Sequence, residues 1–196
     1  GLLYKGNPAD TTEIKEWAAS PSYYRKRTLL RILPIAVTVI NFLCISLAIL
    51  GIISANIAGG VFVSFVLFST IFSKGITKLQ TTYGEKLQIL STYADQILLT
   101  EQKEMHSHIL QELKTDLTSQ NQTASQAVRQ LSKLMNALDQ RSNLLMSTIL
   151  NGLIFWELRQ VMRIEKWKEI HASDLPRWIE TIGEIDAYCS LATFAY

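Results

Sequence analysis

Polar and apolar positions divide the chain into three stretches with different patterns. Residues 32–73 contain no Asp, Glu, Lys or Arg, whereas the residues on either side are ordinarily charged. Residues 74–196 repeat apolar side chains at intervals of three and four, which is the spacing of amphipathic helices. Residues 1–31 combine one short amphipathic segment with a basic cluster. No stretch shows the alternation of a strand, so the pattern predicts an all-α protein, a bundle of long helices with an apolar helical hairpin.

The uncharged stretch has the right length for two helices across a bilayer. A membrane-spanning helix needs about 20 apolar residues, and residues 33–53 and 55–72 supply 21 and 18. The sequence SANIAGG, at residues 54–60, contains the Ser, Asn and Gly residues that favour a tight turn. We therefore predict two transmembrane helices. The alternative is a helical hairpin buried in the core of a soluble protein, which the polar Asn41 and Asn56 would suit better.

Basic residues flank both outer ends of the predicted hairpin. Residues 25–31 include four Arg and Lys residues, and Lys74 and Lys78 follow the second helix. Loops rich in Lys and Arg stay on the cytoplasmic side of a membrane. We expect a protein of the cytoplasmic membrane that contacts membrane lipid and keeps its helical core domain in the cytoplasm. If the hairpin were a soluble core, the protein would be cytoplasmic.

Several helices are predicted outside the hairpin. In the first stretch we expect a short helix capped by Asp10 or Thr11 and ended by Pro21. Trp167 and Trp178 are expected to anchor the last helices by burial. The segment ILNGLIFW, at residues 149–156, is unusually apolar and is expected to be buried on several sides. The remaining predicted helices cover about residues 76–97, 105–117, 124–138 and 142–170, and a last helix that follows Ser173 or Asp174 and contains Pro176.

The sequence predicts no catalytic, cofactor-binding or metal-binding residue. His106 and His108 are two positions apart, so on a helix they point about 200° apart and cannot share an ion. Glu180 and Glu184 lie one turn apart, as expected for the solvent face of an amphipathic helix. No glycine-rich phosphate-binding motif occurs. We expect this chain by itself not to be an enzyme.

Charge and cysteine content point away from DNA binding and from a disulfide framework. Residues 1–31 carry six basic and three acidic groups, and residues 74–196 carry thirteen basic and fourteen acidic groups. A surface that grips nucleic acid normally has a basic excess, so charge does not support DNA binding by this chain. Cys44 and Cys189 are expected to be small buried apolar residues in a reducing compartment.

The last twenty residues carry a resemblance to a known family. The sequence WIETIGEIDAYCSLATFAY resembles the helix that precedes the ATPase domain in MutS-related proteins, in particular a membrane-bound MutS-like branch of Bacteroidetes-type bacteria. The stretch TASQAVRQLSKLMNALDQRSN and the apolar helical pair after RILPI are also similar. The residues that match the pattern of this helix are Gly183, Glu184, Ala187, Ser190, Leu191, Ala192, Phe194 and Ala195.

This resemblance implies a helical core and lever segment that was cut before a C-terminal ATPase domain. ATP and Mg²⁺ would then bind in that following domain, and none would bind in this chain. The partners implied are the protein's own ATPase domain, a second copy in a homodimer and, for the whole parent protein, DNA. The Phe-x-Glu motif with which mismatch-repair MutS proteins recognise mismatches is absent. Gly183 is expected to let the last helix pack closely on a neighbour.

These observations predict three parts and leave a second interpretation open. The parts are an N-terminal amphipathic and basic segment at 1–31, the apolar hairpin at 32–73 and a helical core and lever domain at 74–196. The first interpretation is a non-catalytic lever of a membrane-associated MutS-like ATPase, which couples nucleotide state to the rest of the protein. The alternative is a membrane-tethered helical scaffold, or a coiled-coil interaction module, with no role on DNA.

Overall fold

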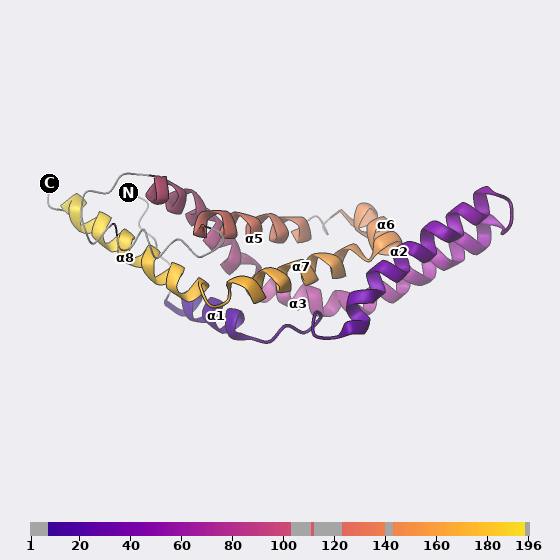
Figure 1. Cartoon of the computed structure of the whole chain (residues 1–196), viewed down its shortest axis with the longest axis horizontal. Coiled ribbons are helices and arrows are strands. Elements are labelled where there is room, and N and C mark those ends of the chain that lie inside the picture. Colours follow the sequence, from indigo (N-terminus) through magenta and orange to yellow (C-terminus); the bar gives the residue numbers. More distant parts are fainter. Residues whose placement is uncertain (1–7, 103–110, 112–122, 140–142, 195–196) are drawn as a thin grey trace. The chain divides into compact units, whose positions relative to one another are not determined.

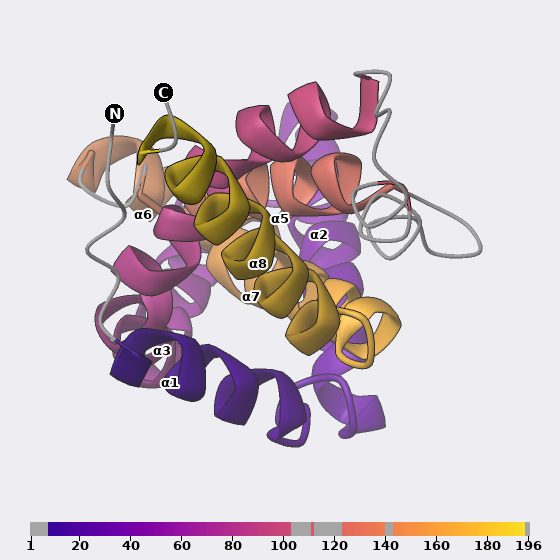
Figure 2. The same cartoon turned by 90° about the vertical axis from the view of Figure 1, so that its left-hand side faces the viewer.

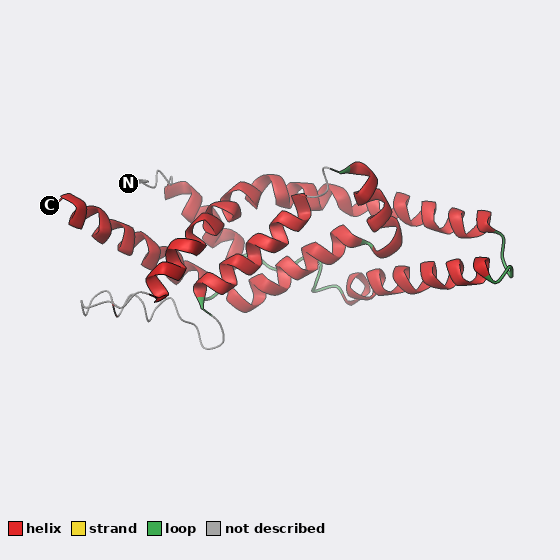
Figure 3. Cartoon of the chain, turned by 90° about the horizontal axis from the view of Figure 1, so that it is seen from above, coloured by secondary structure: helices red, strands yellow, loops and turns green. Residues whose placement is uncertain are grey.

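The computed structural model describes residues 8–102, 111, 123–139 and 143–194. These residues form helices and loops and no strand (Figures 1 and 3). The all-α prediction is therefore confirmed for the described part of the chain. Its helices are α1 Pro8–Ala19, α2 Thr28–Ile49, α3 Ala55–Gln102, α5 Ala124–Asp139, α6 Leu144–Ile154, α7 Trp156–His171 and α8 Leu175–Phe194.

The helix α2 and the first part of α3 form the predicted hairpin and run antiparallel (Figures 1 and 3). The turn between them lies earlier than predicted. Gly51 has a φ of 73°, and its N–H donates to Ala48 O at 3.1 Å while the N–H of Ile52 donates to Leu47 O at 3.0 Å. This is a Schellman ending, which favours glycine at that position. Gly59 and Gly60, which were predicted to form the turn, lie inside α3.

The helix α3 does not end near Phe72 as predicted. It is 48 residues long and extends from the uncharged stretch into the charged one. No proline occurs between Ala55 and Gln102, and single glycines such as Gly75 weaken a helix without ending it. The change from uncharged to charged residues within α3 therefore does not mark the end of a helix. The same helix carries the apolar hairpin and the start of the following amphipathic stripe.

The single helix predicted for residues 142–170 is divided in two at Phe155. This residue adopts a left-handed conformation with a φ of 50°, which costs a non-glycine residue roughly 1–3 kcal/mol. The ring is 1% exposed, and burying such a side chain contributes about 1.5–3 kcal/mol. The ring also contacts Phe65, Phe68 and Phe72 at centroid distances of 6.0–6.3 Å. Packing therefore offsets the backbone cost of the break.

The starts of the other helices agree with the sequence prediction in two cases out of three. The helix α5 starts at Ala124, and α8 starts directly after Asp174 with Pro176 in its second position. The helix α1 starts at Pro8, so Asp10 and Thr11 lie inside it and do not cap it. Proline suits the first turn of a helix because it has no N–H to leave unbonded there.

Contacts divide the chain into two units, each assembled from separate stretches of sequence. Unit 1 comprises Gly1–Ser20, Glu85–Lys133 and Trp167–Tyr196, and unit 2 comprises Pro21–Gly84 and Leu134–Lys166. This division does not follow the three sequence stretches, whose assignment as domains stays a prediction. The helices α3, α5 and α7 contribute residues to both units.

The described core of unit 1 contains three tryptophans among aliphatic residues. The helix α1 packs on α8 (Figure 2), and the ring of Trp17 stacks on Trp167 with centroids 6.4 Å apart. Trp167 and Trp178 are 2% and 0% exposed, so their predicted burial is confirmed. The Nε1 of Trp167 also donates to Ala127 O of α5 at 2.8 Å. Lys168 covers the Trp17 ring at 5.4 Å and donates to Ser20 O at 2.9 Å.

Unit 2 has an apolar core of its own, which includes Phe155. Val37 of α2 and Ile76 of α3 are each 1% exposed, and they are joined by residues of α5 and α7. Gly75 allows α3 to approach Tyr24, since a methyl group there would overlap the Tyr24 hydroxyl. The other core residues of this unit are Tyr24, Met135, Leu138, Leu158, Val161 and Ile164.

Candidate functional site: the apolar hairpin and the basic pocket at its base

The apolar residues of the hairpin face outward. Two segments, Thr28–Ile49 and Ala55–Thr82, are long and apolar enough to cross a membrane, with mean hydropathies of 2.5 and 1.9. Only 17% and 6% of their most apolar windows are buried in the structure. A helix in the core of a soluble domain would be mostly enclosed. Their exposed large residues include Ile32, Ile35, Val39, Phe42, Leu43, Ile57, Val63, Leu67 and Ile71.

A third helix extends this exposed apolar surface. The short helix α6 packs against α2 and exposes Leu145, Met146 and Ile149 at 79%, 50% and 48%. The expectation that the ILNGLIFW segment is buried on several sides is therefore only half right. Asn151 and Phe155 are buried, whereas the other side of α6 is open.

Asn41 ties α6 to α2 at the middle of the hairpin. Its side chain is 2% exposed, and its Nδ2 donates to Gly152 O at 2.9 Å and to Leu153 O at 3.2 Å. On the other side of α6, a methyl group at Gly152 would overlap the side chains of Phe62 and Val66. Glycine therefore permits α3 to approach α6 closely, and the Asn41 amide uses two carbonyls that the end of α6 leaves free.

A buried carboxylate holds the junction of α6 and α7. Glu157 is 5% exposed and accepts hydrogen bonds from Asn151 Nδ2 at 2.9 Å and from Ser147 Oγ and Ser73 Oγ, both at 3.1 Å. The Oδ1 of Asn151 in turn accepts the backbone N–H of Glu157 at 3.0 Å and so caps α7. The carboxylate of Glu157 is therefore hydrogen-bonded on several sides inside the unit, as a buried polar group requires.

A second buried carboxylate, Glu165, fixes the segment before α2. It accepts the backbone N–H groups of Tyr23, Tyr24 and Arg25 at 2.7–3.1 Å. Burial raises the pKa of the Tyr24 phenol, and the charge of Glu165 raises it further. The tyrosine therefore stays neutral, and the segment before α2 is held in one conformation on α7.

Arg159 fastens α7 to the start of α2. Its Nη2 donates to Pro34 O at 2.9 Å and to Thr38 Oγ1 at 2.7 Å, and its Nε donates to Ile154 O at 2.7 Å. All three acceptors are neutral oxygens. The guanidinium is therefore held in place without being neutralised.

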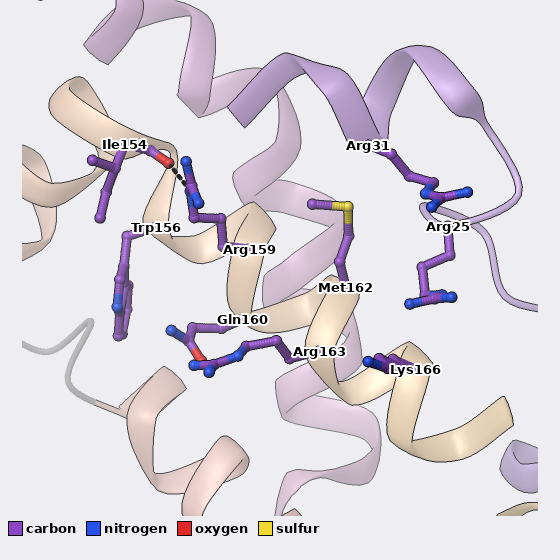
Figure 4. A pocket seen from close by; sticks show the side chains of 9 residues that line it. All are labelled: Arg25, Arg31, Ile154, Trp156, Arg159, Gln160, Met162, Arg163 and Lys166. Carbon is purple, nitrogen blue, oxygen red and sulfur yellow. Dashed lines mark hydrogen bonds between the residues drawn. The ribbon is translucent and has the colours of Figure 1, made fainter. Parts of the chain in front are cut away.

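Around Arg159 lies a pocket of about 530 Å³ between α7 and the residues that lead into α2 (Figure 4). Its lining includes five cationic side chains and no acidic one. They belong to a strongly basic unit, since unit 2 contains ten Arg and Lys residues and three Asp and Glu residues, for a formal charge of +7. We call this site the basic pocket. Its lining residues are Arg25, Arg31, Ile154, Trp156, Arg159, Gln160, Met162, Arg163 and Lys166.

Sequence reasoning missed the basic pocket, although part of its pattern was visible. Arg159, Arg163 and Lys166 are spaced i, i+4 and i+7, so they share one face of a helix. What the sequence could not show was that α7 returns to Arg25 and Arg31, more than 120 residues earlier in the chain. The excess of basic residues in unit 2 was therefore not visible when charge was counted over continuous stretches of the sequence.

The residues that resemble the MutS-related helix form no pocket in the described part of the chain. Gly183, Glu184 and Ala187 are exposed on α8, and no described atom lies within 4 Å of a methyl group placed at Gly183. No described residue therefore packs closely against Gly183, although the sequence had led us to expect such packing. Ser190, Leu191, Ala192 and Phe194 belong to the helical backbone of α8, but their side chains lie outside the described residues, as does all of Ala195.

Other residues named from the sequence have mixed outcomes. Glu180 and Glu184 are exposed, so the predicted solvent face is confirmed. Cys44 is only half-buried on α2, which corrects the expectation that it is enclosed, and the side chain of Cys189 lies outside the described residues. His106 and His108 also lie outside them, and the described residues contain no group of three or more metal ligands.

Comparison of the chain with family models, with curated proteins and with solved structures finds no match.

Proposed function

We propose that this chain is a membrane-anchored, non-catalytic helical module. In this proposal α2 and the first part of α3 cross the cytoplasmic membrane, and α6 contacts lipid beside them. The observation that carries the proposal is the exposure of the hairpin, of which 17% and 6% of the two apolar windows are buried. Burying apolar surface stabilises by about 25 cal/mol per Å², so exposure on this scale in water would be unfavourable, whereas lipid removes the cost.

The hydrogen bonding at the hairpin also suits a bilayer. Within the lipid, polar groups need partners inside the protein, and Asn41 has three carbonyl acceptors, on Val37, Gly152 and Leu153. The hydroxyls of Thr38, Ser46 and Ser64 each bond to a carbonyl one turn earlier in their own helix. The basic residues before α2, with Lys74 and Lys78 on α3, favour a topology in which both outer ends of the hairpin are cytoplasmic.

Membrane insertion is tested by alkaline carbonate extraction, and topology by labelling of single cysteines in sealed membranes. We expect the chain to resist extraction. In a background without Cys44 and Cys189, a membrane-impermeant thiol reagent added from outside should label Ser54→Cys at the tip and not Lys78→Cys. Extraction into the supernatant would contradict the anchor, and equal labelling of both positions in intact vesicles would contradict the topology.

We further propose that the polar helices act as a lever in a membrane-associated MutS-like ATPase, as the resemblance of residues 178–196 implies. Two features support a lever: α3 is continuous for 48 residues, and α8 is continuous through that segment to Phe194. A helix is stiff along its axis and can transmit a displacement produced by ATP in a following domain. ATP and Mg²⁺ would bind in that domain and a homodimer would be its functional form, whereas the charge of this chain gives no support to DNA binding.

The lever proposal predicts what the coding region contains after Tyr196. A predicted strand followed by GxxxxGK[ST] should occur within the next domain, because this loop holds the phosphates of ATP. A stop codon, or a long tail without such a loop, would remove the lever and leave a membrane-tethered helical scaffold. That scaffold is the alternative function, and it keeps the anchor unchanged.

A further inference from the structure

The basic pocket has the composition of a phosphate-binding site. Five of its nine lining residues are cationic, and four of these are arginines, whose planar groups match the geometry of phosphate oxygens. The volume of about 530 Å³ lies within the range of small-molecule sites, roughly 300–1,000 Å³. A pocket of this kind attracts an anion of moderate size.

Most of these cations are not neutralised by the protein. The side chains of Arg31, Arg163 and Lys166 have no hydrogen bond or ion pair with any residue that the structure describes, and Arg159 binds only neutral oxygens. The two carboxylates that α7 contributes to unit 2, Glu157 and Glu165, are engaged elsewhere. Glu157 bonds with Ser73, Ser147 and Asn151, and Glu165 bonds with the backbone of residues 23–25.

Gln160 adds a requirement for a hydrogen-bond donor. Its side chain lines the pocket and is 7% exposed, and its Oε1 has no hydrogen-bond partner among the described residues. Buried amide oxygens are normally bonded. A ligand that carries a hydroxyl as well as a phosphate would satisfy both the cations and this acceptor. Gln160 and Arg163 are three residues apart on α7 and both line the pocket, so one ligand could reach both.

We propose that the basic pocket binds the headgroup of an acidic glycerophospholipid, with its phosphodiester on Arg31, Arg163 and Lys166 and a headgroup hydroxyl donating to Gln160. This inference rests on the proposed membrane anchor. Arg31 is in the first turn of α2, and Arg159 is bonded to Pro34 one turn further along. The pocket therefore opens where an inserted α2 would enter the layer of lipid headgroups. The apolar part of its wall, Ile154, Trp156 and Met162, suits the glycerol and upper acyl region.

The test uses the full chain reconstituted in phosphatidylcholine vesicles. Resistance to carbonate extraction is checked first in these neutral vesicles, because insertion by the hairpin does not depend on lipid charge. Spin-labelled phosphatidylglycerol or spin-labelled phosphatidylcholine is then added in trace amounts. The motionally restricted fraction of each spectrum gives the selectivity of the protein for the acidic lipid. We expect a clear preference for phosphatidylglycerol.

The preference should depend on the pocket and not on charge alone. Arg163→Gln combined with Lys166→Gln removes two pocket cations and should lower the selectivity about tenfold. Lys74→Gln combined with Lys78→Gln removes the same charge from exposed positions of α3 and should lower it far less. Equal loss in the two double variants would overturn the proposal, as would the absence of selectivity in an inserted chain. A chain that carbonate extracts would overturn the membrane anchor itself.

A matched pair of lipids tests the role of Gln160. Phosphatidylmethanol has the same charge as phosphatidylglycerol and no hydroxyl, so the wild type should bind it more weakly. Gln160→Leu should abolish that difference while both lipids still bind, and an unchanged difference would exclude Gln160 from the site. Glycerol phosphate and a short DNA duplex are added as soluble competitors. Displacement of the lipid by either at comparable concentration would assign the pocket to a soluble phosphate or to nucleic acid and overturn the lipid proposal.

Discussion

Unit 1 and unit 2 distribute their apolar and charged residues in opposite ways. Unit 1 buries Trp17, Trp167 and Trp178, the aromatic side chains that the structure describes there, and has nine basic and fourteen acidic residues, for a formal charge of −5, whereas unit 2 has a charge of +7. Among the described residues, every exposed large apolar side chain except Ile170 belongs to unit 2. Unit 2 also buries two carboxylates and the amides of Asn41, Asn151 and Gln160.

The difference indicates that the two units are adapted to different surroundings. In unit 1 the hydrophobic effect selects the inside, as it does in water. In unit 2 several polar groups, among them Asn41, Asn151, Glu157 and Glu165, are buried and hydrogen-bonded, and many apolar side chains are directed outward, which is the arrangement that a lipid solvent favours. The described part of the chain therefore combines a unit with an enclosed apolar core and a unit with an exposed apolar surface, and three helices contribute residues to both.

Truncating one aromatic residue in each unit should give the largest difference in folding free energy between the two units. Trp178→Ala removes a side chain that is 0% exposed in unit 1 and should cost about 3–5 kcal/mol of folding free energy. Phe42→Ala removes an aromatic side chain that is 58% exposed in unit 2 and should cost far less. Chemical denaturation in detergent, followed by tryptophan fluorescence, measures both. Similar losses for the two variants would show that Phe42 is enclosed in solution and that the comparison is wrong.

A charge placed on the outward face of α2 should oppose insertion. Leu43 is 56% exposed near the middle of this helix, and arginine there should cost about 2.5–3.5 kcal/mol of insertion free energy. Ile170→Arg, at a residue 57% exposed in unit 1, should leave insertion unchanged. The carbonate-resistant fraction measures the effect. Full resistance of Leu43→Arg would place this face against protein or water instead of lipid.

Removing the Asn41 amide should loosen α6 with a smaller effect. Asn41→Ala loses the bonds to Gly152 O and Leu153 O, and interhelical hydrogen bonds of this kind contribute about 0.6–2 kcal/mol in membranes. Ser46→Ala is the control, because the Ser46 hydroxyl bonds only to Phe42 O within α2. Hydrogen exchange of the α6 amides in detergent should rise for Asn41→Ala alone. No change would mean that packing at Gly152 is sufficient to hold α6.

The smallest expected effect is a dependence of stability on pH in unit 1. Burial lowers the pKa of His171, although Asp174 acts in the opposite direction, and the ring lies between Trp167 and Trp178 at 5.0 and 5.6 Å. As pH falls through about 6.5, the unfolded chain binds a proton more readily than the folded one, so stability should decrease. His171→Phe keeps an aromatic ring and should flatten this dependence in denaturation curves measured above and below that pH. An equal slope in the variant would assign the effect to other groups.

The sequence was sufficient for the helical class and for most helix positions, because these depend on local composition and periodicity. The uncharged run located the hairpin, and Ala124 and Asp174 marked the starts of α5 and α8 correctly. It failed at the end of α3 and at Phe155. In the first case no residue interrupts the helix at the change in composition. In the second the break depends on the contact of one ring with three distant phenylalanines.

The basic pocket could not be predicted because its two halves are far apart in the sequence. Arg25 and Arg31 were visible as a charge cluster before the hairpin, and Arg159, Arg163 and Lys166 as one helix face. The two groups of basic residues lie together because Glu165 binds the backbone of residues 23–25 and Arg159 binds Pro34 O. A count of charges along the chain cannot detect contacts between residues that are so far apart in the sequence.

The discontinuity of unit 2 also sets an order of events during synthesis. Residues 21–84 leave the ribosome first, whereas residues 134–166, which bring α6 and the basic face of α7, follow later. At 5–20 residues per second, the hairpin is complete roughly 4–16 s before Lys166 is made. For most of that interval the nascent hairpin has neither the carbonyls of Gly152 and Leu153 for Asn41 nor Arg159 for Pro34. The hairpin is therefore made before the residues that hold α6 and α7 against it, and the basic pocket is the last part of unit 2 to be completed.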